Sequence, residues 1–339
     1  MGSDSPGDSS KQPGGREGQV AVDDLPAELR EDPEKLERVL RIMRSDSYTP
    51  AERDLALLAS GDLTAIRLLL EFIKPQLALA ERNINSTIVL FGGTRILEPA
   101  VARKRLDDAV AARAAGAALG DAEHERLDRE VRVAERIVAR SHYYDVARDF
   151  ARLVSRAGQS EDRCDYVIVT GGGPGIMEAG NRGADDVGAQ SIGLNITLPQ
   201  EQVPNPYITP DLCFQFHYFA IRKMHFLRIA LALVAFPGGF GTLDELFDTL
   251  CLIQTRKMEP VPVILVGEEF WRGVIDFEQM EAEGVIAPRE RELFTFAETA
   301  EQIRDAILDW YGIEAFASPT PETLAERRRM AAAELARED

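Results

Sequence analysis

The chain has 339 residues, of which 45% are hydrophobic, and its formal net charge is −18 at pH 7. A charge of this sign argues against a nonspecific nucleic-acid binder and against docking on anionic membranes, because both carry phosphates that would repel it. No window approaches the roughly 18 apolar residues of a membrane span, and no CxxC or HExxH motif suggests a zinc site. Three widely spaced cysteines favour reduced thiols, so we expect a cytoplasmic protein without a metal centre.

The N-terminal part of the chain is predicted to be a tail followed by a helical appendage. Residues 1–25 are rich in Gly, Ser, Pro and Asp, a composition typical of disorder. A first helix is expected after Asp32, which caps it, with proline at the favoured first position. A second is expected from Thr49, which opens a Thr-Pro-Ala-Glu capping box, and the apolar run 66–73 continues this arm. We therefore assign residues 26–85 to an N-terminal helical appendage.

Five short apolar runs predict the strands of an α/β core. They lie at residues 87–91, 166–170, 191–196, 231–236 and 261–266. Helical patterns separate these runs, and uninterrupted apolar strands are typical of a parallel sheet that is covered on both faces. The expected fold is therefore a Rossmann-like, doubly wound α/β sheet.

An insertion and a tail complete the expected domain organisation. Residues 99–140 are rich in Ala, Arg, Glu and Asp, with Gly116 and Gly120 at the expected bend. Apolar residues recur at helical spacing in the second half of this segment, which indicates a helical hairpin or one long helix. We place the insertion within an α/β domain at residues 86–315 and regard residues 316–339 as a C-terminal tail.

Two glycine-rich turns are the most informative features of the sequence. Gly-Gly-Gly-Pro-Gly at 171–175 follows the second predicted strand, and Pro-Gly-Gly-Phe-Gly at 237–241 follows the fourth. Each turn opens a helix that carries a glutamate near its start, Glu178 in one and Glu245 in the other. Free backbone N–H groups at the positive end of a helix bind phosphate-sized anions. Either turn alone is explained equally well as a tight connection, whereas two such turns, each with a glutamate, favour an anion site beside an acid.

Two common glycine motifs do not fit these turns. The dinucleotide-binding fingerprint needs a third small residue, but Ile176 and Asp244 stand at that position. The acidic residue that would bind the ribose is absent too, because its expected position lies near Asn195. Neither turn contains the Gly-Lys-Ser/Thr of a P-loop. A hydride-transfer cofactor site and a P-loop are therefore disfavoured.

The two turns resemble those of the "lonely guy" (LOG) phosphoribohydrolase family. The family pattern PGGxGTxxE is matched at every fixed position of 237–245, and its Arg-Lys pair is matched by Arg222 and Lys223 on the preceding helix. The resemblance covers roughly residues 86–312. The first strand ends in Phe-Gly-Gly-Thr-Arg at 91–95, where short plant members have a Cys-Gly-Ser-Ser run, and this difference leaves the preferred base open.

The resemblance implies an enzyme that hydrolyses the N-glycosidic bond of nucleoside 5′-monophosphates, releasing the free base and ribose 5-phosphate. AMP and cytokinin riboside 5′-monophosphates are the leading substrates, no cofactor is implied, and a homodimer is expected. An older label for this family, lysine decarboxylase, has no support in the residues, because nothing marks a lysine that would hold pyridoxal phosphate.

The resemblance and the chemistry of the turns together predict the site residues. Glu245 is expected to stabilise an oxocarbenium-like transition state or to activate water, and Arg222 to assist it electrostatically. The 5′-phosphate is assigned to Gly238, Gly239, Gly241 and Thr242. Further substrate contacts are predicted at Gly171, Gly172, Gly173, Glu178, Lys223, Thr94 and Arg95. The proline-rich loop at 199–210 is a candidate lid.

Two alternatives stay open at this point. One is a nucleosidase with broad purine and pyrimidine specificity, and the other is a non-catalytic carrier of a nucleotide or of a molybdenum cofactor on the same fold. Glu245 separates an enzyme from a carrier, because a carrier needs the glycine turn but has little use for an acid at that depth together with Arg222.

Overall fold

The computed structural model describes residues 25–116, 120–160, 163–198, 203–316 and 321–336. The chain divides into two compact units, Met1–Arg67 and Leu68–Asp339, and each is described by itself. The predicted tail at 1–25 lies almost entirely outside the described residues, and the predicted domain boundaries stay a prediction. Among the described residues, no helix is both long enough and apolar enough to cross a membrane.

The first unit is built from short helical segments. They are α1 (Ala27–Arg30), α2 (Pro33–Met43), α3 (Leu55–Ala59) and the 3₁₀ turns η2 (Asp46–Tyr48), η3 (Ala51–Arg53) and η4 (Gly61–Leu63). Helix α2 begins as predicted, because the Asp32 side chain accepts a hydrogen bond from the Lys35 backbone N–H at 3.1 Å. The prediction that a helix begins at Thr49 is wrong, because only the short 3₁₀ turn η3 forms there. Asp54 instead caps α3 by accepting from the Leu57 N–H at 2.9 Å.

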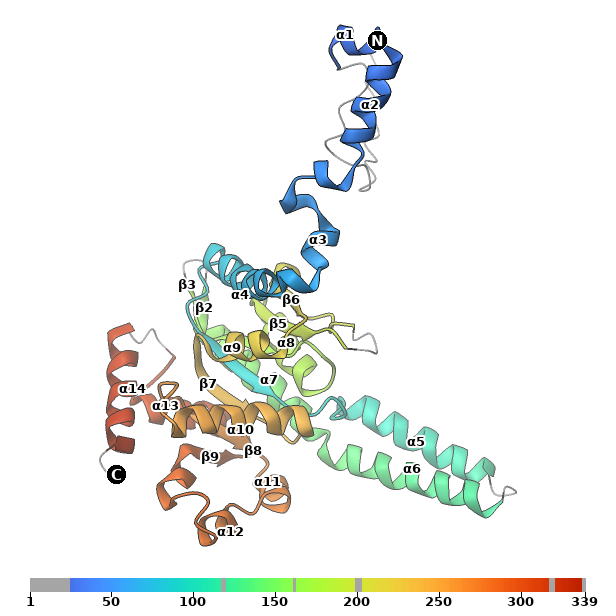
Figure 1. The fold of residues 1–339 in the computed structure, drawn as a ribbon. Helices are drawn as coiled ribbons and strands as arrows, with labels where there is room; N and C mark the ends of the chain where they lie inside the picture. The colour runs from blue at the N-terminus through green and yellow to red at the C-terminus, as the bar shows by residue number, and fades with distance from the viewer. Residues whose placement is uncertain (1–24, 117–119, 161–162, 199–202, 317–320, 337–339) are drawn as a thin grey trace, which may run out of the picture. The chain divides into compact units, whose positions relative to one another are not determined.

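The second unit is organised around a seven-stranded sheet in the order β6-β5-β4-β1-β7-β8-β9 (Figure 1). Every neighbouring pair is parallel, which confirms the predicted Rossmann-like α/β class. The strands are β1 (Thr87–Phe91), β4 (Val167–Thr170), β5 (Ser191–Ile196), β6 (Cys213–Phe216), β7 (Ala230–Ala235), β8 (Val263–Val266) and β9 (Phe294–Ala297). A separate small hairpin pairs β2 (Gln159–Ser160) with β3 (Arg163–Cys164).

The five predicted strands are the five inner strands of this sheet, and the two strands at its edges were missed. Inner strands such as β1 and β7 are buried along their whole length, which gives continuous apolar runs. The edge strands β6 and β9 are half exposed, so polar residues interrupt their apolar ones. Their sequences therefore lack the run that marks a strand buried on both faces.

The helices are α4 (Thr64–Glu81), α5 (Pro99–Ala115), α6 (Asp121–Arg140), α7 (His142–Gly158), α8 (Ile176–Asp185), α9 (Phe219–Leu227), α10 (Phe240–Gln254), α11 (Glu268–Val274), α12 (Phe277–Ala282), α13 (Ala300–Tyr311) and α14 (Pro321–Ala336), with 3₁₀ turns η6 (Pro210–Leu212) and η7 (Pro288–Leu293). Helices cover both faces of the sheet, whereas α5 and α6 extend away from it (Figure 1). Alternate side chains of β1 enter two different cores. Ile88 and Leu90 pack with α7, α8 and α13, whereas Val89 and Phe91 pack with α4, α9 and α10.

The predicted insertion is a helical hairpin of α5 and α6 (Figure 1). Gly116 caps the end of α5 and Gly120 caps the start of α6, so the bend lies where the two glycines predicted it. Leu127, Val131 and Ala134 form the buried stripe of α6. The rest of the hairpin is largely exposed, and it holds none of the residues that line the candidate site below.

Candidate functional site

Three turns meet beyond the carboxyl ends of β4, β1 and β7, which are neighbours in the sheet. The Gly93 N–H donates to the Pro237 carbonyl at 2.9 Å, and the Ile176 N–H donates to the Gly93 carbonyl at 3.3 Å. Gly175 adopts a φ of +73°, and a Cβ there would collide with the Gly93 carbonyl, so only glycine allows this close approach. The turns therefore form one unit at the edge of the sheet where ligands of such folds bind.

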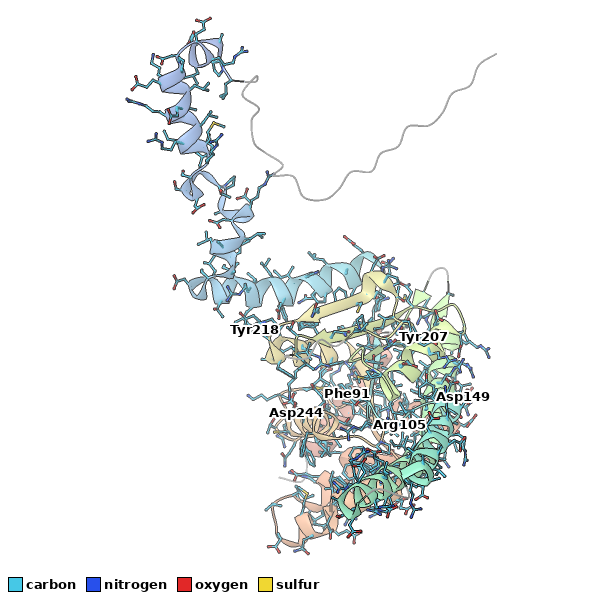
Figure 2. The ribbon with its side chains drawn as sticks, turned by 90° about the vertical axis from the view of Figure 1, so that its right-hand side faces the viewer. Phe91, Arg105, Asp149, Tyr207, Tyr218 and Asp244 are labelled. Carbon is cyan, nitrogen blue, oxygen red and sulfur yellow. The ribbon has the colours of Figure 1, made fainter. Side chains whose placement is uncertain are left out.

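A cavity of about 310 Å³ opens among these turns. Its polar lining comes from Gly92, Gly93, Thr94, Gly171, Arg222, Gly239, Gly241, Thr242, Asp244 and Glu245. Its apolar lining comes from Phe91, Met177, Ile196, Leu198 and Phe219. Phe91 and Asp244, which stand on different elements of the wall, are labelled in Figure 2. Some of the predicted residues of each turn thus share one cavity with Arg222 of α9.

The start of α10 presents an anion-binding geometry to this cavity. The Gly239 carbonyl accepts from the N–H groups of Thr242 and Leu243, both at 3.0 Å, and closes the first helical turn. The N–H groups of Gly239, Phe240 and Gly241 donate to no other described residue. A Cβ at Gly239 or Gly241 would meet nothing within 4 Å, so both glycines border open space. These free donors lie at the positive end of a 15-residue helix.

The predicted phosphate site is refined in two places. The Thr242 N–H is used within the helix, so its hydroxyl is the group left to face the cavity. Gly238 is not in the lining: a Cβ there would collide with the Thr242 side chain, so this glycine makes room for that threonine. The Phe240 N–H was missed because the prediction considered the motif's fixed residues and not the backbone of its variable position.

Glu245 is a buried acid in the wall of the cavity. Its side chain is 6% exposed, and among the described residues no group donates a hydrogen bond to its carboxylate. Burial raises the pKa of Glu245 to about 7, and the positive charges of Lys223 and Arg222 offset only part of this effect. A carboxyl group with such a pKa exchanges protons readily near neutral pH.

Arg222 reaches the same cavity from α9. Its Nε donates to the Leu194 carbonyl at 2.8 Å, and its guanidinium lies 5.2 Å from the centre of the Phe226 ring. Burial lowers the pKa of Arg222, while the charge of Glu245 opposes this shift, and the guanidinium stays charged at neutral pH. A Cβ at Gly171 would lie 2.7 Å from Nη2 of Arg222. The predicted contact residue Gly171 therefore leaves the space that the guanidinium occupies.

Glu178 is not brought into this cavity. It accepts a hydrogen bond from the Tyr144 hydroxyl at 2.8 Å. Arg182 donates to the same hydroxyl at 3.3 Å and to Glu98 at 3.0 Å. Burial raises the pKa of Tyr144, so its hydroxyl stays protonated and donates. Glu178 thus belongs to a network that joins α8 to α7, although its place in the sequence resembles that of Glu245.

Of the other predicted contacts, some line the cavity and others lie outside it. Thr94 lines the cavity, whereas Arg95 is exposed and lies outside the lining. Lys223 forms an ion pair with Asp244 at 2.9 Å, next to the cavity. Burial lowers the pKa of Lys223, but the hydrogen bond that Lys223 donates to Asp244 and the charges of nearby acids outweigh burial and raise this pKa. Lys223 thus neutralises the acidic face of α10 and is not part of the lining.

Gly172 and Gly173 are held by the proline-rich loop that was predicted to be a lid. Asn205, only 6% exposed, donates its side-chain amide to the Gly173 carbonyl at 3.1 Å and its backbone N–H to the Gly172 carbonyl at 2.9 Å. A second buried amide, Asn181, donates to Ser191 at 3.0 Å and accepts from Asn205 at 2.9 Å. The described part of this loop therefore supports the turn, while residues 199–202 lie outside the described residues.

Sequence reasoning missed the apolar wall of the cavity. Met177, Ile196, Leu198 and Phe219 come from α8, from β5 and the residues after it, and from α9. Each belongs to an apolar pattern that its own helix or strand explains, so no local signal separates these residues from ordinary core residues. Only the parallel order of the strands brings them together.

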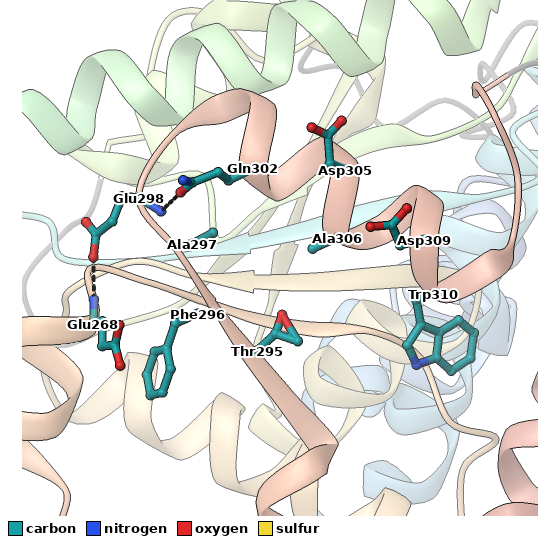
Figure 3. Close-up of a pocket in the computed structure, with 10 residues that line it drawn as sticks. All are labelled: Glu268, Thr295, Phe296, Ala297, Glu298, Gln302, Asp305, Ala306, Asp309 and Trp310. Carbon is teal, nitrogen blue, oxygen red and sulfur yellow. Dashed lines mark hydrogen bonds between the residues drawn. The ribbon is translucent and has the colours of Figure 1, made fainter.

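A larger cavity of about 680 Å³ lies elsewhere, between β9, the start of α11 and α13 (Figure 3). Its lining includes the carboxylates Glu268, Glu298, Asp305 and Asp309. Four acids with no basic residue in the lining repel a phosphate, so this cavity is a poor site for a nucleotide. Among the described residues, no group of three or more His, Cys, Asp or Glu side chains is arranged to hold a metal ion.

Comparisons with known proteins match the part of the chain that supplies much of this cavity. Residues 177–307 match the family model described as "Possible lysine decarboxylase". A cytokinin riboside 5′-monophosphate phosphoribohydrolase of Arabidopsis thaliana is 28% identical over 170 residues, which cover 48% of this chain and 74% of that protein. The resemblance to the LOG family is confirmed. The LOG-type segment contains Arg222, the 237–241 turn and Glu245.

Other similarities are narrower than this LOG-type match. A pyrimidine/purine nucleotide 5′-monophosphate nucleosidase of Escherichia coli K12 is 35% identical over 127 residues, or 33% of this chain and 26% of that protein. The chain thus spans about a quarter of that relative's length. Among solved structures, a molybdenum cofactor binding protein of Rippkaea orientalis is 18% identical with a TM-score of 0.35, covering 49% of this chain and 86% of that one. A likeness at this level carries no argument about function.

Proposed function

We propose that this protein hydrolyses the N-glycosidic bond of nucleoside 5′-monophosphates and releases the free base and ribose 5-phosphate. One observation carries the proposal. The buried carboxylate of Glu245, which receives no hydrogen bond from the described residues, shares a cavity with Arg222 and with the free N–H groups at the start of α10. An acid, a fixed cation and an anion site together match the needs of a sugar phosphate that is cleaved at its anomeric carbon.

The 5′-phosphate is assigned to the start of α10. The N–H groups of Gly239, Phe240 and Gly241 and the hydroxyl of Thr242 supply donors to the phosphate oxygens. The open space beside the two glycines lets the phosphate approach the backbone. This contact fixes the ribose within reach of a carboxylate one to two helical turns further along α10.

The chemical step is assigned to Glu245. As the bond between C1′ and the base nitrogen breaks, its electrons leave with the base and positive charge develops on the ribose. The carboxylate stabilises this charge and accepts a proton from the water whose oxygen bonds to C1′. Glu245 then gives this proton to the departing base, so the carboxylate is regenerated and one water molecule is consumed for each bond cleaved. A pKa of about 7 suits a group that gains and loses this proton.

Arg222 is assigned an electrostatic and positional role. An arginine does not transfer protons at neutral pH, so it acts as a fixed positive charge beside the nucleotide. Its bond to the Leu194 carbonyl and its place over the Phe226 ring hold the guanidinium in one orientation. This charge also keeps part of the Glu245 population ionised, because it opposes the effect of burial on that pKa.

The base is assigned to the apolar wall formed by Met177, Ile196, Leu198 and Phe219. We propose AMP or a cytokinin riboside 5′-monophosphate as the substrate; the name of the plant relative supports the second of these. A broad purine and pyrimidine nucleosidase is the second candidate, supported by the name of the bacterial relative and by the few polar groups on this wall. A homodimer in the cytoplasm is part of this proposal and follows from the resemblance to the family.

A panel of nucleoside 5′-monophosphates tests the proposal. Each is incubated with the protein, and the free base is separated by chromatography. Release of base from AMP, with ribose 5-phosphate in equal amount, is the expected result. Release from purine and pyrimidine nucleotides alike would favour the broad nucleosidase. Binding of nucleotides without any release of base would contradict the enzyme and favour a carrier.

A further inference from the structure

Helix α9 carries Arg222, but no side chain of its own caps its start. Its first residue is Phe219 and its N-cap is Tyr218, whose side chain makes no capping hydrogen bond. The backbone just before the helix is instead held by another helix. Glu71 on α4 accepts from the His217 N–H at 2.8 Å with one carboxylate oxygen and from the Tyr218 N–H at 3.2 Å with the other. Both helices belong to the second compact unit in this region.

The geometry points to Glu71 as a positioning residue for Arg222, and this inference rests on the proposed function. The path from one to the other is short. The Tyr218 N–H is held by Glu71, and the Tyr218 carbonyl accepts from the Arg222 N–H at 3.2 Å. The Arg222 side chain then bonds to the Leu194 carbonyl. Tyr218, the middle residue of this path, is labelled in Figure 2.

The charge of Glu71 suits this task. A carboxylate at a helix N-terminus is favoured by the helix dipole, and a hydrogen bond with one ionised partner is stronger than a neutral one. Two oxygens that bind two successive N–H groups fix the direction of the chain as well as its distance. The turn of α9 that holds Phe219 and Arg222, both in the cavity lining, therefore starts from a defined position.

A second contact joins the same two helices through packing. The ring of His225, on α9, is buried, and its Nε2 has no hydrogen-bond partner among the described residues. The same ring lies 5.4 Å from Phe72 and 5.4 Å from Phe216, centre to centre. Helix α4 thus stays attached through packing when the Glu71 carboxylate is removed.

The inference gives α4 a role in the reaction although none of its residues is among those that line the cavity. Glu71 acts through the position of α9, so its removal should lower turnover more than substrate binding. A displacement of about 1 Å in a catalytic group costs up to about 100-fold in rate. For Glu71→Ala we expect a fall in kcat for AMP of about 10-fold, with KM changed less than about twofold.

The test is a double-mutant cycle on the full-length protein. Glu71→Ala, Glu71→Gln, Arg222→Ala and the double variants are compared by AMP hydrolysis. Glu71→Gln keeps an acceptor oxygen and should recover part of the lost kcat. In the Arg222→Ala background, Glu71→Ala should cause no further loss. The control is Glu81→Ala, which removes an exposed glutamate from the same helix and should leave kcat unchanged. Wild-type kcat in Glu71→Ala, or an equal loss with and without Arg222, would overturn the inference.

Backbone amide exchange supplies a readout that does not depend on activity. We expect faster exchange at His217, Tyr218 and Arg222 in Glu71→Ala, with the amides of β1 unchanged. Unchanged exchange at all three positions would overturn the inference even if AMP is hydrolysed. If the wild-type protein releases no base from any nucleotide, the proposed function fails, and faster exchange at these positions would still support the control of α9 by Glu71.

Discussion

The two glycine-rich turns share one sequence pattern, but their glycines lie in different environments. In the 171–175 turn every glycine is buried, and a Cβ at Gly172 would collide with Asn195. In the 237–241 turn Gly239 and Gly241 are exposed and have open space beside them. The first set of glycines lets chain segments pack closely, whereas the second leaves open space beside the backbone, as the proposed phosphate site requires.

The glutamates that follow the two turns also differ in their environments. Glu178 is engaged by the Tyr144 hydroxyl, whereas Glu245 is buried without a donor and its pKa is raised to about 7. A structural acid has its hydrogen bonds satisfied, and a catalytic acid is kept in a costly environment. The comparison teaches that hydrogen-bond partners and burial, more than position in a motif, distinguish a structural glutamate from a candidate catalytic one.

The largest expected effect is that of Glu245→Gln on turnover. Glutamine has nearly the same shape but neither carries a negative charge nor accepts a proton from water. We expect kcat for AMP to fall by about 10² to 10⁴-fold, with nucleotide binding largely retained. Steady-state rates and equilibrium binding of AMP measure the two parts separately. Normal turnover in this variant would remove Glu245 from the reaction and end the distinction between the two glutamates.

The same substitution should stabilise the protein at alkaline pH. The pKa of Glu245 is about 7 in the folded state, against 4.5 for an ordinary glutamate carboxyl group. The folded state therefore holds the proton more tightly, and the stability that this supplies is present at low pH and lost as pH rises through 7. A shift of this size corresponds to about 3 kcal/mol, a cost that Glu245→Gln avoids.

Thermal or denaturant unfolding at pH 5 and pH 8 checks this expectation. The free energy of unfolding of Glu245→Gln, relative to the wild type, should be higher at pH 8 than at pH 5. A difference that does not change with pH would show that the carboxylate is well solvated, contrary to its burial. Gain of stability with loss of turnover would identify Glu245 as an acid held in place for function.

Much of this arrangement could be predicted from sequence, and the failures have physical causes. The inner strands and the start of α10 were predicted because burial on both faces and a glycine turn leave local signals. The edge strands β6 and β9 leave weaker ones. The partner of Glu178 could not be predicted, because Tyr144 lies 34 residues earlier. The amphipathic pattern of its own helix accounts for this tyrosine without any role beside Glu178. The pKa of Glu245 depends on the packing of several elements, so it cannot be predicted from a local motif.

A smaller effect is expected from Gly171→Ala, because the new side chain would compete for space with the Arg222 guanidinium. The new Cβ would lie 2.7 Å from Nη2 of Arg222 and 2.9 Å from the Met177 sulfur, so the guanidinium must move. We expect about a 10-fold fall in kcat. Gly273→Ala is the matched control, because a Cβ there meets nothing within 4 Å. Equal rates in the two variants would mean that Arg222 tolerates displacement.

The smallest effect is expected from Glu178→Gln. This is the same substitution as Glu245→Gln, made in the helix that follows the 171–175 turn. The glutamine keeps an oxygen that accepts from the Tyr144 hydroxyl, so the link between α7 and α8 persists with a neutral acceptor. Loss of the charge should cost about 1 kcal/mol of stability and change kcat less than about threefold. Unfolding and AMP hydrolysis measure the two quantities on the same preparation. A loss of turnover as large as that of Glu245→Gln would mean that both glutamates serve the reaction, and that the bond from Tyr144 orients an acid for catalysis instead of satisfying a structural one.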